Sequence, residues 1–295
     1  MLRGGGTAAF PTETVYGLGA VATDARAVAA VFGAKGRPAD NPLIVHLADA
    51  SDAAAVAVVT PLGAALFAAF APGPLTLVLP CRGVLPDAVT AGLGTVAVRV
   101  PAHETARSLI RAVGAPLVAP SANRSGRPSP TTWEAVRDDL AGRVGAVLMG
   151  DPTRVGIEST VVDATGDAPV VLRPGAVTLA DLQRVAPGAR EATAGDDGAR
   201  SPGTRHRHYA PRAPVNLLLG SPPPPRGAAY IGLERPLPGY LLACQCRTVE
   251  EYAHALYDFF RQADAVGATR IDAQPVREEG LGRALMDRLR RAAAA

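Results

Sequence analysis

Short apolar runs alternate with polar stretches rich in glycine and proline along the first 187 residues of the chain. Turn-forming residues bound each run, which is typical of buried strands. The runs predict strands at 7–10, 43–47, 75–79, 96–100, 116–119, 144–149, 160–163 and 169–172. The last two flank the turn sequence ATGDAP, which predicts a hairpin.

Stretches rich in alanine and leucine lie between these runs. They predict helices at 25–34, 52–59, 62–71, 103–113 and 133–141. Asp24, Ser51 and Thr60 are the expected N-caps of the first three, and Thr131 with Glu134 forms a capping box for the last. We therefore expect an α/β domain with a twisted mixed sheet over residues 1–187.

A second α/β unit is predicted at residues 215–295, after a linker-like stretch at 188–214 that is rich in alanine, glycine and charge. Its pattern predicts strands at 215–219, 228–233, 239–243 and 269–273, and helices at 248–263 and 280–292. These elements favour a small Rossmann-like domain. It has no glycine-rich turn, so we do not expect it to bind a nucleotide by itself.

The linker contains one segment, SPGTRHRHYAP, that is unlike its surroundings. It combines a basic run and Tyr209 with prolines that restrict its course, a composition suited to closing over an anionic ligand. We predict that it is a lid over the binding site of an anionic ligand. The alternative is a plain tether whose tyrosine packs on the surface.

Gly17, Gly19 and Ala22 match the pattern G-x-G-x-x-A of dinucleotide-binding domains. That pattern requires a strand directly before the first glycine and a helix that begins at the second. Here the preceding residues are polar and turn-like, and the next helix begins after Asp24. We therefore discount the match.

Composition narrows the class of protein. The chain has 295 residues, 48% of them hydrophobic and 19% charged, as in an ordinary soluble globular protein. A net charge of +3 is too small to indicate nucleic-acid binding. The three cysteines match no metal or disulfide spacing. Without a membrane-length apolar run or a signal-peptide core, we expect a cytoplasmic protein that binds no membrane.

The stretch KGRPADNPLIVH at residues 35–46 is the first candidate for chemistry. Lys35 and Arg37 flank Gly36, so a tight turn can bring two cations together, as polyphosphate binding requires. A solvated basic turn is the alternative. The loop PSANRSGRPSPTT, with its hydroxyls, arginines and glycine, resembles a phosphate-binding loop in composition.

Arg99 lies in an otherwise apolar strand, on the same face as Thr95 and Ala97 under two-residue alternation. An unpaired guanidinium inside a protein is costly. If Arg99 points inward, we expect it to wait for the carboxylate of a ligand. If it points outward, it is a surface arginine.

Eight strings, in this order over residues 7–211, resemble the threonylcarbamoyl-AMP synthases of the long form: FPTETVYGLGA, KGRPADNPLIVHL, PGPLTLVLP, TVAVRVP, APSANRSGRPSPT, GIESTVVD, VLRPGA and SPGTRHRHYAP. The resemblance implies a YrdC-like catalytic domain joined to a small C-terminal domain. It implies that L-threonine and bicarbonate form N-carboxythreonine, which attacks the α-phosphate of ATP to give threonylcarbamoyl-AMP and pyrophosphate. A downstream transferase then uses the adenylate to modify the tRNA adenosine next to the anticodon.

The same resemblance implies residue roles. It implies a threonine site made of Thr14, His46, Arg99, Ala119 and Ser159. It implies an ATP site made of Lys35, Arg37, Asn41, Thr95, Ser121, Ser129, Arg173 and Tyr209, in which Lys35 and Arg37 are catalytic. Mg²⁺ would bind to the phosphates of ATP and not to protein ligands. Because the carbamate of the substrate is the nucleophile, catalysis would depend on positioning and charge neutralisation.

Two other functions compete with this one. The first is the carbamoyl-adenylate-handling domain of a carbamoyltransferase, which shares the YrdC-like fold but comes with extra domains. The second is an RNA-binding module that uses an arginine-lined surface. Its mark would be salt-dependent affinity for RNA without threonine-dependent turnover of ATP.

Overall fold

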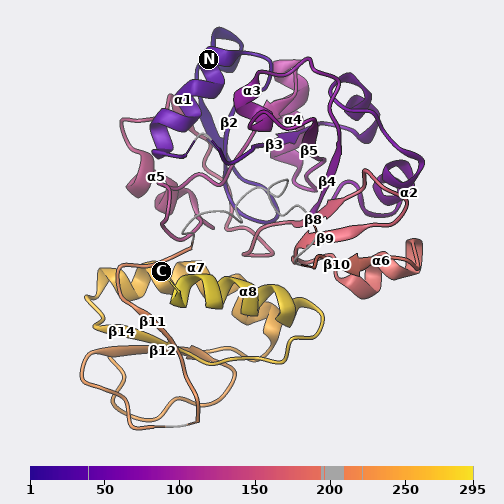
Figure 1. The fold of residues 1–295 in the computed structure, drawn as a ribbon. Coiled ribbons are helices and arrows are strands. Elements are labelled where there is room, and N and C mark those ends of the chain that lie inside the picture. The colour runs from indigo at the N-terminus through magenta and orange to yellow at the C-terminus, as the bar shows by residue number, and fades with distance from the viewer. Residues whose placement is uncertain (39, 194–195, 197–208, 221, 295) are drawn as a thin grey trace.

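A computed structural model describes residues 1–38, 40–193, 196, 209–220 and 222–294. Among these residues the strands form two sheets, one of ten strands and one of four. Figure 1 shows the two sheets in separate parts of the molecule, with the helices of the smaller part facing the larger part.

The larger sheet has the strand order β10-β9-β8-β4-β5-β3-β6-β2-β1-β7. Its strands are β1 (Ala8–Phe10), β2 (Gly17–Val21), β3 (Ile44–His46), β4 (Leu75–Pro80), β5 (Thr95–Arg99), β6 (Leu117–Val118), β7 (Ala146–Val147), β8 (Thr160–Asp163), β9 (Val170–Arg173) and β10 (Arg190–Glu191). Parallel pairs such as β3 with β5 occur beside antiparallel pairs such as β4 with β5, so the sheet is mixed, as predicted. The predicted hairpin is β8 with β9.

Helices and 3₁₀ turns connect these strands. They are η1 (Leu2–Gly4), α1 (Ala25–Lys35), η2 (Ala50–Ala55), α2 (Pro61–Phe70), α3 (Asp87–Thr90), α4 (Glu104–Val113), α5 (Trp133–Leu140) and α6 (Leu179–Val185). The predicted caps of α1 and α2 are confirmed: Asp24 accepts from the backbone of Arg26, and Thr60 from that of Gly63.

Four local predictions were wrong. The expected helix at 52–59 is the shorter 3₁₀ turn η2, because Asp49 and not Ser51 caps it. Thr132 and not Thr131 caps α5, accepting from Ala135 N. The strand expected at 144–149 covers two residues only. β2 was missed because glycine is unfavourable in strands; Gly19 is required there, since the ring of Phe10 lies 2.6 Å from where its Cβ would be.

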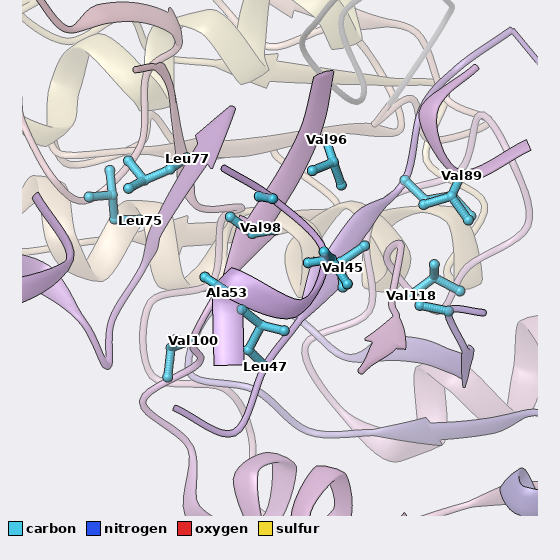
Figure 2. Packing of buried hydrophobic residues seen from close by; sticks show 14 of the residues in the cluster. Val45, Leu47, Ala53, Leu75, Leu77, Val89, Val96, Val98, Val100 and Val118 are labelled. Carbon is cyan, nitrogen blue, oxygen red and sulfur yellow. The ribbon is translucent and has the colours of Figure 1, made fainter. Parts of the chain in front are cut away.

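The main core lies on one face of the larger sheet. Figure 2 shows valines and leucines of β3, β4 and β5 packed side by side, with Val96, Val98 and Val100 pointing into this core. Thr95, Ala97 and Arg99 therefore occupy the opposite face, as the two-residue alternation predicted. This alternation places a guanidinium on the face where the candidate site lies.

The smaller part contains a four-stranded sheet in the order β11-β14-β12-β13, and its pairs are parallel. Its elements are β11 (Val215–Leu217), β12 (Ala228–Gly232), β13 (Leu242–Gln245), α7 (Val249–Ala265), β14 (Arg270–Ala273) and α8 (Leu281–Ala293). The predicted small Rossmann-like α/β unit is confirmed. β10 lies inside the predicted linker and extends the larger sheet by pairing with β9.

Two findings bear on the environment of the protein. In the part of the chain that the structure describes, no helix is long and apolar enough to cross a membrane. Cys81, Cys244 and Cys246 are free thiols, and the sulfurs of Cys244 and Cys246 lie 3.8 Å apart.

Candidate active site

A pocket opens where the ends of β3 and β5 meet the loops before β2 and after β6. The strand register brings His46 at the end of β3 opposite Arg99 at the end of β5. Nine of the residues implied by the resemblance line it: Thr14, Arg37, His46, Arg99, Ala119, Ser121, Ser159, Arg173 and Tyr209. Seven separate segments of the sequence therefore meet at one cavity.

The Lys35–Arg37 turn closes one side of this pocket. α1 ends at Lys35, and Gly36 follows in the left-handed conformation with φ 61°. Lys35 is buried, and its Nζ donates to the carbonyl of Asn123 at 2.6 Å and also to that of Ser121. Burial, with the charge of Arg37, lowers the pKa of Lys35. A solvated turn is excluded, because the buried lysine donates to backbone carbonyls of the loop at residues 120–132, here called the PSAN loop.

Arg37 faces the pocket itself. Its Nη2 donates to the carbonyl of Pro42 at 2.9 Å, which fixes the guanidinium against the start of β3. Burial and the positive charge of Arg173 lower the pKa of Arg37 to about 10, although Tyr209 acts in the opposite direction. At neutral pH the group stays charged, so Arg37 offers a cation to an anionic ligand at this side.

Arg99 points inward and is buried, so the surface alternative is excluded. Its Nη1 donates to Thr14 Oγ1 at 3.0 Å, and its Nε donates to the carbonyl of Gly73 at 3.3 Å. The expectation that it waits for a ligand carboxylate needs a correction, because Glu13 Oε1 already lies 2.7 Å from its Nη2. A protein carboxylate thus orients the guanidinium and cancels part of its charge before any ligand arrives.

His46 lies beside Arg99 and is also buried. Burial lowers its pKa to about 3, and the positive charge of Arg99 acts in the same direction. Its Nδ1 is 3.3 Å from the carbonyl of Ile44. The ring is therefore neutral at physiological pH and adds a hydrogen-bonding group to the pocket without adding charge.

Arg173, at the end of β9, lies on the side of the pocket formed by Ser159. Its Nη2 donates to the carbonyl of Ser159 at 3.0 Å and its Nε donates to the same atom at 3.2 Å. Ser159 Oγ is 2.8 Å from Thr76 Oγ1 on β4. These contacts hold the serine and the guanidinium in a fixed relation at the mouth of the β8–β9 hairpin.

The predicted lid is described only from Tyr209 onward; its residues 201–208 lie outside the described part of the chain. Tyr209 is buried, lines the pocket and has φ 70°, a value that only a well-supported non-glycine residue adopts. Ala210 N donates to the carbonyl of Gly126 at 3.0 Å, which ties the segment to the PSAN loop. The tether alternative, with Tyr209 on the surface, is excluded.

Four implied residues, Lys35, Asn41, Thr95 and Ser129, do not line the pocket directly. Lys35 and Ser129 support its walls, since Ser129 Oγ donates to Glu158 Oε1 at 2.6 Å. Asn41 is buried, and its carbonyl accepts from Arg37 at 3.3 Å. Thr95 begins β5, four residues before Arg99.

Sequence reasoning assigned no role to Glu13 or Glu158, both of which are buried. Each precedes a hydroxyl residue of the implied site, Thr14 and Ser159, inside strings that carry the resemblance. A carboxylate directly beside an implied ligand residue was the available signal. Their partners Arg99 and Arg288 could not be assigned, because they lie 86 and 130 positions away.

The described residues offer no group of three or more acidic, histidine or cysteine side chains that could hold a metal ion. Among the carboxylates near the pocket, Glu13 faces Arg99 and Glu158 faces Arg288. Donors already committed to guanidinium groups are unsuited to a hard divalent cation.

Two family models match consecutive parts of the chain. The model described as telomere recombination matches residues 1–175, and the model described as the C-terminal domain of threonylcarbamoyl-AMP synthase matches residues 177–294. Threonylcarbamoyl-AMP synthases of Pyrococcus abyssi and Bacillus subtilis are each 43% identical to this chain, over 99% of its length and 91% of their own. A crystal structure of Pyrococcus abyssi Sua5 complexed with L-threonine superimposes with a TM-score of 0.91 at 42% identity, covering 99% of this chain and 92% of that one.

Proposed function

The chain belongs to the family of threonylcarbamoyl-AMP synthases, and on that premise we propose that the pocket described above joins L-threonine, bicarbonate and ATP. The products are threonylcarbamoyl-AMP and pyrophosphate, so the enzyme is a nucleotidyltransferase. The adenylate serves the threonylcarbamoyl modification of the tRNA adenosine next to the anticodon.

Threonine occupies the side formed by Arg99, with Thr14, His46, Ala119 and Ser159 around it. The carboxylate of threonine approaches the remaining N–H groups of Arg99, since a guanidinium has five donors in a planar fork. Glu13 keeps that fork in one orientation. The neutral ring of His46 exchanges a hydrogen bond with the substrate without repelling its ammonium or carbamate form.

ATP occupies the side formed by Arg37, Arg173, Ser121 and Tyr209. Arg37 and Arg173 neutralise phosphate charge, and the backbone of the PSAN loop, held by Lys35, contributes to the floor. Asn41, Thr95 and Ser129 complete the site as supporting residues. We propose a catalytic role for Arg37, which lines the pocket where negative charge grows as pyrophosphate leaves, and a supporting role for Lys35, which holds the carbonyls of Ser121 and Asn123 in the ATP loop.

The chemistry proceeds in two steps in this scheme. The amine of threonine attacks the carbon of bicarbonate, and loss of water leaves the carbamate of N-carboxythreonine. A carbamate oxygen then attacks the α-phosphorus of ATP, and the bond from that phosphorus to the bridging oxygen of pyrophosphate breaks. No protein nucleophile is needed, so the chain contributes orientation, charge neutralisation and exclusion of water.

Mg²⁺ is part of the substrate in this proposal and enters as MgATP. The ion would draw electron density from the phosphates and lower the cost of pyrophosphate departure. The tRNA threonylcarbamoyl transferase that consumes the adenylate would meet the enzyme in a transient encounter, without direct tRNA binding by this chain.

The observation that carries the proposal is the convergence of Arg37, Arg99 and Arg173 on one pocket beside a neutral histidine. The test is pyrophosphate release from MgATP by the full chain, with and without L-threonine and with bicarbonate supplied or depleted. Release should require both. Equal release after bicarbonate depletion would contradict the proposal, and salt-dependent RNA binding without threonine-dependent turnover would favour the RNA-binding alternative.

A further inference from the structure

Arg288 is a fully buried arginine in α8, the last helix of the chain. It follows Leu281 by seven positions and stands next to Leu289, on a face whose other members are apolar. A helix of this pattern ordinarily has a hydrophobic residue there. Because a buried guanidinium is unfavourable without acceptors, its partners indicate why the position is charged.

The main partner of Arg288 is Glu158, which lies across the boundary between the two parts of the molecule and lines the pocket. Arg288 Nε donates to Glu158 Oε2 at 2.8 Å, its Nη1 donates to Asp287 Oδ2 of its own helix at 2.5 Å, and its Nη2 donates to the carbonyl of Pro174 at 3.1 Å. Tyr257 of α7 donates its hydroxyl to the same Oε2 at 3.0 Å. One carboxylate of the larger part thus accepts from both helices of the smaller part.

The other oxygen of Glu158 contacts the PSAN loop on the ATP side, since Ser129 Oγ donates to Oε1 at 2.6 Å. Arg288 also reaches the opposite wall, because its guanidinium lies 5.3 Å from the centre of the Tyr209 ring. That ring stacks on Tyr257 at 5.6 Å. Arg288 therefore contacts the supports of two walls of the pocket at once (the position of α8 is visible in Figure 1).

We infer that Arg288 is a positioning residue for ATP: through Glu158 and Tyr209, the last helix of the chain completes the ATP side of the pocket. This inference rests on the proposed function of that pocket. Arg288 is not among the residues that line the pocket, so it acts on a substrate through other residues. We expect it to affect the binding of ATP and not that of threonine, because Glu13 and Arg99 of the larger part organise the threonine side.

Charge explains why an arginine and not a leucine is used. Glu158 is held in the carboxylate form: burial would raise its pKa, but Arg288 and Arg173 lower it below the ordinary value. A bare carboxylate at the wall of a polyphosphate site would repel the ligand. Arg288 cancels this charge from behind, while Glu158 keeps its hydrogen bonds to Ser129 and Tyr257.

The test uses the full chain and steady-state pyrophosphate release, with KM measured separately for ATP and threonine. Arg288→Met should raise KM for ATP about tenfold and change KM for threonine less than about twofold, since it leaves Glu158 unpaired beside the phosphates. Glu158→Gln/Arg288→Met removes both charges of the Glu158–Arg288 pair and keeps an acceptor for Ser129, while Asp287 keeps Arg291 as its partner. It should bring KM for ATP back to within about threefold of the wild type.

A purely structural role would not produce that recovery. If the pair only holds the two parts together, the double variant would bind ATP no better than Arg288→Met, and this outcome would overturn the inference. Arg290→Met on the same helix is the matched control, because Arg290 pairs with Glu278 at the surface and should leave both KM values unchanged. Should Arg288→Met fail to fold, Arg288→Lys replaces it. A single ammonium cannot hold Glu158 and the Pro174 carbonyl as a fork does, so KM for ATP should rise about threefold, and a wild-type value would overturn the inference.

The two proposals fail in different ways. If the wild-type enzyme releases pyrophosphate without threonine, the proposed function is wrong whatever Arg288 does. If wild-type release requires threonine and bicarbonate but Arg288→Met has a wild-type KM for ATP, only the role of Arg288 is wrong.

Discussion

The proposed threonine side and the proposed ATP side of the pocket both pair a buried carboxylate with an arginine, but they are assembled differently. Glu13 and Arg99 both belong to the larger sheet and its loops, whereas Glu158 receives Arg288 from the last helix of the smaller part. The first side is complete once the larger sheet has formed. The second is complete only when the smaller part has docked, so substrate binding and domain docking are linked on one side alone.

Removal of the smaller part is the strongest way to test this difference. Deletion of residues 200–295 should abolish synthesis, lowering the rate at least about 100-fold, because Tyr209, Tyr257 and Arg288 all leave the ATP side. Threonine binding, measured by calorimetry, should survive within about tenfold. A truncated, folded domain that makes the adenylate at the full-length rate would show that the smaller part is dispensable.

Substitution of Arg99 is expected to affect the threonine side alone. Arg99→Ala should weaken threonine binding by about 2–4 kcal/mol, seen as a raised KM for threonine, because a charge-assisted forked contact is lost and Glu13 is left unpaired. Arg99→Lys keeps the charge without the fork, so it should recover only part of the loss. Unchanged threonine dependence in Arg99→Ala would remove the assignment.

A second pair across the boundary separates docking from completion of the pocket. Asp139 of α5 is buried and accepts from Arg261 of α7 at 2.9 Å and from Arg127 at 2.6 Å, and none of these three residues lines the pocket. Asp139→Asn should lower the free energy of unfolding by roughly 2–3 kcal/mol while changing KM for ATP less than about threefold. Asp138→Asn, at the exposed neighbouring position, is the control for both measurements. A tenfold change in KM for ATP would mean that any docking contact acts on the pocket.

The pH dependence of stability tests the charge balance on the threonine side. His46 has a pKa of about 3 in the folded chain and about 6.5 when unfolded, so the unfolded chain binds the extra proton between these values. The contribution of the neutral His46 ring to the free energy of unfolding is complete above pH 6.5. It decreases as pH falls toward 3, by about 1 kcal/mol between pH 6.5 and 5.5. In His46→Gln, the free energy of unfolding measured by chemical denaturation should no longer show this decrease with falling pH. His254→Gln, at an exposed position, should leave the wild-type slope, and an unchanged slope in His46→Gln would argue against a buried neutral ring.

Local sequence patterns were sufficient for most elements. The strand at 96–100 and the helix after Asp24 have clear periodicity and a strong cap, and the structure has both. The two-residue alternation also put Arg99 on the face opposite the core. Prediction failed where a local signal had a near-equivalent neighbour, as with Thr131 and Thr132, or where glycines disguised a strand, as in β2.

The sequence by itself determined the order of the elements, the family and the implied site residues, because each depends on residues close together in the chain. Only the tertiary structure decided which charges meet. Glu13 lies against Arg99 and Glu158 against Arg288, over separations of 86 and 130 residues. Such pairs form because strand order and helix docking bury both partners at the same place. A buried charge without a counter-ion is costly, so the pairing depends on which residues the fold brings together.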